Sequence, residues 1–116
     1  MEIREYQQKV DQWIKDFGVR YFDEKTNMIL LVEEVGELSS LVARQFGEQS
    51  FKGQESTDIE IKQNLGDEMA DILFVLSCLA NQMDINLEEA VLQNFNKKTS
   101  RDKDRHKNNP KLGFNI

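Results

Sequence analysis

Two short acidic motifs contain the residues of this sequence that are best suited to chemistry. The first covers residues 33–37 (Glu-Glu-Val-Gly-Glu) and the second covers residues 67–71 (Asp-Glu-Met-Ala-Asp). Both lie in segments whose apolar residues recur with helical spacing, so some of the carboxylates must point toward the interior of a helix bundle. Because unpaired buried charge is very costly, the simplest explanation is a hard divalent cation such as Mg²⁺, which prefers oxygen ligands.

Helical geometry separates the acids of the two motifs, since an α-helix advances about 100° per residue. Glu34 falls inside the apolar arc of its helix and Glu37 falls at the edge of that arc. On the later helix, Glu68 is central to the apolar face and Asp71 lies beside it. Two such pairs on facing helices would surround one small volume. We therefore predict that these four residues hold the metal ion.

The remaining acids, Glu33 and Asp67, fall outside the apolar faces. Either Glu33 or Glu37 could act as the general base toward a water molecule, and the pattern does not choose between them. Asn64 lies one turn before Glu68 on the same strip and is a candidate substrate contact. The competing interpretation is that the acids are solvated or form ion pairs with nearby basic residues: Lys25, Arg44 and Lys62.

Other kinds of catalytic site do not fit the sequence. The single histidine, His106, lies in the polar C-terminal segment, which argues against a Glu-x-x-His di-iron site and a Ser-His-Asp triad. There is no Walker-type glycine-rich loop. The single cysteine, Cys78, excludes an intrachain disulfide, and its apolar surroundings predict a small buried hydrophobic residue.

The charge distribution limits the partners of the protein. The net charge of −6 argues against a general nucleic-acid binder. Residues 97–111 nevertheless carry a net charge of +5, so this segment could bind phosphate groups or could simply be solvated. No basic stretch followed by an apolar one marks a signal peptide, and the apolar run 72–80 is too short to span a bilayer, so we expect a cytoplasmic protein.

The periodicity predicts four helices and no strand. The first covers residues 2–16, and the second begins near Thr26 or Asn27 and ends near residue 45. A connection over residues 47–56 leads to a third helix, which begins after Thr57 or Asp58 and ends near residue 83. Asn86 is expected to cap a fourth helix over residues 87–100.

These elements predict an all-α four-helix bundle. We expect a helical domain over residues 1–101, followed by a polar, basic tail over residues 102–116. Bundles of this size leave apolar surface on the first and third helices, so we expect a second copy to cover it, in a dimer or a dimer of dimers.

The two motifs together resemble those of the MazG-like all-α nucleoside triphosphate pyrophosphohydrolases. The similarity lies in Glu34-Val35-Gly36-Glu37 and Glu68-Met69-Ala70-Asp71, and it extends over residues 20–101. It implies Mg²⁺-dependent cleavage of a nucleoside triphosphate between its α and β phosphates, with Mn²⁺ as a substitute metal. It also implies that the four acids bind the metal and that the biological role is removal of unwanted nucleotides.

The resemblance further implies substrate contacts from the last helix. The family carries Lys, Asn and Arg there; Arg101 matches, and Lys98 is a substitute, as are Asn94, Asn96 and Lys97. Aromatic residues could stack on the base or pack in the core: Trp13, Tyr21 and Phe22. The alternatives are hydrolysis of phosphoribosyl-ATP or a nucleoside diphosphate, and a non-catalytic helical adaptor.

Overall fold

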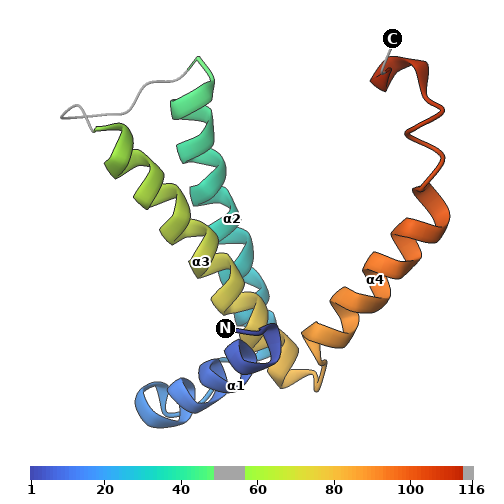
Figure 1. Ribbon diagram of the computed structural model, residues 1–116. Coiled ribbons are helices and arrows are strands. Elements are labelled where there is room, and N and C mark those ends of the chain that lie inside the picture. Colours follow the sequence, from blue (N-terminus) through green and yellow to red (C-terminus); the bar gives the residue numbers. More distant parts are fainter. Residues whose placement is uncertain (49–56, 114–116) are drawn as a thin grey trace.

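The computed structural model describes residues 1–48 and 57–113, and these residues form helices and turns without a strand (Figure 1). The long helices are α1 (Ile3–Trp13), α2 (Glu24–Phe46), α3 (Asp58–Gln82) and α4 (Leu87–Asp102). A π-helical turn (Ile14–Gly18) follows α1, and a short 3-10 helix (Pro110–Leu112) lies in the C-terminal segment. The prediction of an all-α fold with four helices is confirmed. Most of the predicted connection over residues 47–56 lies outside the described residues.

Side-chain caps determine where the later helices begin. The side chains of Thr57 and Asn86 accept hydrogen bonds from the backbone N–H of Glu60 (3.1 Å) and Glu89 (3.2 Å), as the sequence predicts. Helix α2 begins two or three residues before the predicted start at Thr26 or Asn27. Asp23 accepts a hydrogen bond from the Thr26 N–H at 2.8 Å and is the true cap, so Thr26 lies within the first turn of the helix.

Helices α2 and α3 form an antiparallel pair, and α1 packs across α3 at the end of the pair where α2 begins and α3 ends (Figure 1). The buried apolar core lies where α1 meets α3, around Val10, Ile14 and Cys78. Tyr6, Tyr21 and Phe74 pack against this cluster. Cys78 is only 4% exposed, which confirms that it is a buried residue of the core.

Much apolar surface stays uncovered in the single chain. Val32 and Val35 of α2 are 60% and 48% exposed, although both belong to the apolar arc of that helix. Helix α4 has no buried residue, and it extends away from the α2–α3 pair (Figure 1). The radius of gyration is 18.5 Å, whereas a compact domain of this length has about 13 Å. Within the described residues, no helix combines the length and the apolar character that a membrane span requires.

We predict that the Cys78 thiol does not react in the folded protein. Loss of solvent in the core raises its pKa to about 11, so the thiolate is scarce at pH 8 as well as inaccessible. Labelling with a chromogenic disulfide reagent should be at least ~100-fold slower in the native protein than in denaturant. Unfolding should release one thiol per chain. Rapid labelling under native conditions would show that the core around Val10 and Ile14 opens readily.

Candidate active site

Helices α2 and α3 bring three of the four predicted metal ligands together. Carboxylate oxygens of Glu34, Glu37 and Glu68 all lie within 4.8 Å of one another. Glu34 and Glu68 are half-buried between the two helices, whereas Glu37, almost one turn after Glu34, is exposed at the edge of the group. The arrangement is therefore an acidic cluster with a closed inner side and an open outer side.

Two oxygens of this cluster are buried without a hydrogen-bond partner, one on Glu34 and one on Glu68 (Oε2 in each). Buried polar atoms in proteins are normally satisfied, so two orphaned carboxylate oxygens facing one volume need a donor or a cation. No ion pair among the described residues involves the acids of the cluster, and none involves Lys25, Arg44 or Lys62, the basic residues considered above as their partners. The oxygen-only donor set fits a hard divalent cation.

The electrostatics of the cluster also indicate that its carboxylates need a hydrogen-bond donor or a cation. Loss of solvent, together with the neighbouring carboxylates of Glu34 and Glu37, raises the pKa of Glu68 to about 7. Like-charged carboxylates this close cannot all ionise cheaply, so the cluster takes up either a proton or a cation.

Asp71 is not part of this group of three. Asp71 is half-buried on α3, almost one turn after Glu68. The pKa of Tyr6 on α1 is raised mainly by burial of its hydroxyl, and the negative charge of Asp71 adds to that effect. Asp71 thus lies close enough to α1 to act on Tyr6. Its role as a fourth metal ligand stays a prediction.

The other predicted site residues lie at different distances from the cluster. Glu33, Asp67 and Asn64 are exposed residues on the two acid-bearing helices. Lys98 and Arg101 are exposed on α4, which extends away from these helices (Figure 1). The guanidinium of Arg101 donates two hydrogen bonds to Asp102, at 3.0 and 2.9 Å. Within one chain, the basic side chains of α4 therefore do not lie over the acidic cluster.

An apolar cavity of about 300 Å³ lies between the α1–α2 segment and α3. Aromatic side chains form much of its wall: Trp13, Tyr21, Phe22 and Phe74. Asn27 also lines it, is only 4% exposed, and donates from Nδ2 to Gln82 Oε1 at 2.7 Å. The sequence indicated Asn27 only as a helix start. Its spacing of seven residues from Glu34 could have placed it on the same face of α2, two turns away.

The described residues thus define an all-α protein in which two paired helices, α2 and α3, carry a cluster of three carboxylates. Residues 22–106 match the MazG nucleotide pyrophosphohydrolase domain. The chain belongs to this family, and its enzymatic class is that of a hydrolase acting on pyrophosphate bonds of nucleotides.

Two proteins of Bacillus subtilis (strain 168) are similar in sequence. YpjD is 40% identical over 103 residues, covering 89% of this chain and 88% of YpjD. YvdC is 30% identical over 96 residues, covering 78% of this chain and 91% of YvdC.

Solved structures show the same fold. The crystal structure of YPJD from Bacillus subtilis superimposes with a TM-score of 0.72 at 37% identity, over 84% of this chain and 94% of that one. The Bacillus-conserved MazG protein, described as a nucleotide pyrophosphohydrolase, gives a TM-score of 0.70 at 34% identity, over 90% and 96% of the two chains.

The metal-free protein should lose stability as the pH rises toward 7. The folded-state pKa of Glu68 is raised to about 7, so the folded state holds an extra proton between the ordinary pKa of 4.5 and that value. The bound proton therefore adds to the free energy of unfolding at low pH, and this stabilisation is lost as Glu68 deprotonates near pH 7. The melting temperature in EDTA should therefore fall more between pH 5.5 and 7.5 in the wild type than in Glu68→Gln.

Asp67→Asn, on the exposed side of the same helix, is the matched control and should keep the wild-type pH dependence. Mg²⁺ or Mn²⁺ should raise the melting temperature of the wild type more at pH 7.5 than at pH 5.5, because protons compete with the metal. Equal pH profiles for Glu68→Gln and Asp67→Asn would contradict the assignment.

Proposed function

We propose that the protein hydrolyses a (deoxy)nucleoside triphosphate to the monophosphate and pyrophosphate, with Mg²⁺ held by Glu34, Glu37 and Glu68. The observation that supports this most directly is the pair of buried carboxylate oxygens without partners on Glu34 and Glu68. Asp71 is proposed as a further ligand once the site is loaded. Membership of the family indicates that the bond cleaved is a pyrophosphate bond of a nucleotide. Because Glu37 is the exposed member of the cluster, a substrate would approach a bound metal from the side of Glu37.

The proposed roles of the chain's own residues follow from their exposure. A bound Mg²⁺ would neutralise phosphate oxygens and favour the attacking form of a water molecule. Glu37, a member of the cluster, and Glu33, the neighbour of Glu34 in the sequence, are both exposed on α2, and either is a candidate to accept the proton of that water. Asn64, exposed on α3 one turn before Glu68, can contact the substrate.

We propose that the apolar cavity receives the base. Asn27 lies seven residues before Glu34 on α2, which corresponds to about 10 Å along the helix axis. This is the scale of the separation between a base and the phosphates of one nucleotide. Aromatic walls suit a planar ring, and the cavity of about 300 Å³ is at the lower end of the range for small-molecule sites.

We propose that the active form is a dimer or a dimer of dimers. On α4, Val91, Leu92 and Phe95 share one face and are 43%, 60% and 70% exposed. Together with the exposed valines of α2, they leave an apolar surface that a second copy would cover. Lys98 and Arg101 lie on this helix, so assembly would also decide which cluster they approach.

Pyrophosphate should be the first product when the purified protein acts on its preferred (d)NTP with Mg²⁺. Glu68→Gln removes a charged ligand at the centre of the cluster, and we expect kcat/KM to fall by about 10²–10³-fold. Asp71→Ala should also reduce activity. Pyrophosphate and orthophosphate are measured separately, and circular dichroism checks that each variant is helical.

The control variant for this assay is Asp67→Asn, which should retain activity. A panel containing nucleoside diphosphates and phosphoribosyl-ATP tests the alternative substrates. Release of orthophosphate before pyrophosphate would exclude the proposed bond specificity.

Replacing Phe95 by aspartate should weaken assembly, because it places a charge in the apolar face of α4. Gln93, also exposed, lies on the other side of that helix, so Gln93→Asp is the matched control. Light scattering coupled to gel filtration should give a smaller mass for Phe95→Asp than for Gln93→Asp and the wild type. Identical masses would show that this face is not an interface.

A further inference from the structure

We propose that Gln7 of α1 is a positioning residue that fixes the direction of α4 and thereby the location of Lys98 and Arg101. The proposal rests on the proposed function, together with the prediction from the sequence resemblance that those two groups bind the phosphates of the substrate. Gln7 is 8% exposed, although it is a polar residue on a helix whose other polar side chains are mostly exposed.

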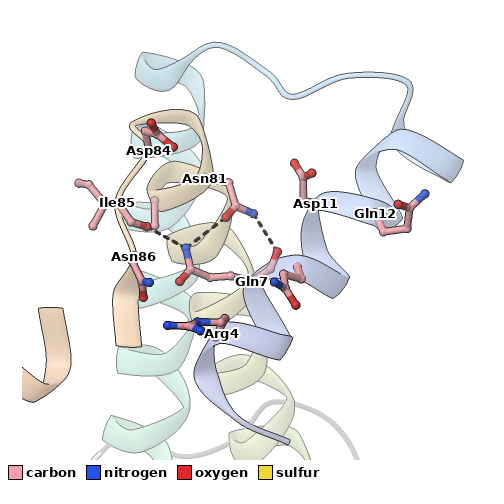
Figure 2. Close-up of a pocket in the computed structure, with 10 residues that line it drawn as sticks. Arg4, Gln7, Asp11, Gln12, Asn81, Asp84, Ile85 and Asn86 are labelled. Carbon is pink, nitrogen blue, oxygen red and sulfur yellow. Dashed lines mark hydrogen bonds between the residues drawn. The ribbon is translucent and has the colours of Figure 1, made fainter. Parts of the chain in front are cut away.

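The side chain of Gln7 connects three elements. Its Nε2 donates to the carbonyl of Ile85 at 2.9 Å and to Asn81 Oδ1 at 3.1 Å, while Asn81 Nδ2 donates back to the Gln7 carbonyl at 3.0 Å (Figure 2). Its Oε1 accepts a hydrogen bond from the backbone N–H of Leu87, the first residue of α4, at 2.8 Å. One side chain of α1 thus binds the end of α3, the turn after it, and the start of α4.

These contacts hold the point about which α4 could pivot. Asn86 is the extended residue (φ −83°, ψ 105°) between the turn and the helix. Gln7 binds the carbonyl just before Asn86 and the N–H just after it, so rotation about the backbone of Asn86 would break one bond or the other. The turn itself is held by the Ile85 N–H, which donates to the Ala80 carbonyl at 2.8 Å.

Few other contacts restrain α4. The helix has no buried residue, and α1 is its main neighbour. The ion pair between Arg4 and Glu88 measures 3.8 Å and is partly exposed, so it constrains the helix weakly.

The hydrogen bonds of Gln7 at the start of α4 strongly affect the position of the far end of that helix, because a small tilt at its base becomes a large displacement along its length. Arg101 lies about 21 Å along α4 from Leu87, so a tilt of about 15° at the base would move it by about 5 Å. Misplacement of a substrate-positioning group by even 1 Å can cost about 10²-fold in rate.

The anchor is also joined to the wall of the apolar cavity. Asn81 Nδ2 donates to the hydroxyl of Tyr21 at 3.1 Å, and the same hydroxyl donates to Asp11 at 2.5 Å. The ring of Tyr21 lines the cavity proposed for the base. The position of α4 and one wall of the cavity therefore depend on the same part-buried polar network.

The test measures the direction of α4 and the activity separately. In a Cys78→Ala background, spin labels at Gln63→Cys on α3 and Ser100→Cys on α4 report one intrachain distance by pulsed electron resonance, with labelled chains diluted in unlabelled protein. The variant is Gln7→Leu, which keeps the volume and removes the hydrogen bonds. Gln8→Leu, at an exposed position of the same helix, is the matched control.

We expect the Gln7→Leu distance distribution to shift or broaden by several ångströms, and that of Gln8→Leu to match the parent. In unlabelled protein, Gln7→Leu should raise KM for the triphosphate by at least about tenfold with a smaller change in kcat, since the misplaced groups bind phosphate. Gln7→Glu keeps the acceptor for Leu87 and should be intermediate in both measurements. It also provides a folded comparison if Gln7→Leu is poorly stable.

Unchanged distances in both Gln7 variants would overturn the proposal, as would a displaced α4 with an unaltered KM. If the wild type releases no pyrophosphate, the proposed function fails, whereas the distance measurement still decides whether Gln7 holds α4.

Discussion

The rest of the structure depends on one electrostatic conflict, the placement of carboxylates from two helices in the same partly buried space. Glu34 and Glu68 face each other across the α2–α3 pair with one oxygen each lacking a partner. Half-buried leucines and isoleucines lie on both of these paired helices, among them Leu31, Leu38, Ile61 and Leu65. Hydrophobic burial therefore maintains a geometry that the charges alone would disperse. The fold thus creates a carboxylate cluster that takes up either a proton or a cation.

Helical periodicity was sufficient to predict the inner half of this site. Glu34 and Glu68 lie in apolar arcs, and the structure places both in the half-buried interface of α2 and α3. The prediction succeeded because a helix fixes side-chain direction once its span is known. For the same local reason the sequence predicted Asn86 as a cap and limited the cap of α3 to Thr57 or Asp58, of which the structure shows Thr57.

Features that depend on packing between distant segments were not predictable in this way. The sequence pattern marks Asn27 only as a possible helix start, whereas the structure places it in the lining of a cavity whose walls come from α1, α2 and α3. Gln7 has no local feature that marks it, because its partners lie near residues 81–87. Nor could periodicity show which three of the four acids come within 4.8 Å of one another, since that depends on how α2 packs against α3.

The adjacency of the two acid-bearing helices along the chain has a consequence for folding. Helices α2 and α3 are sequential and pair directly, so they can associate early, at a small cost in loop closure. Association of α2 and α3 also brings the carboxylates of the cluster together, so their mutual repulsion opposes this step. The contacts of α1 with the end of α3 span more than seventy residues, so their larger loop-closure cost leads us to expect that they form later. A divalent cation present during folding would thus act on the first docking event, so that metal supply would influence the folding rate as well as activity.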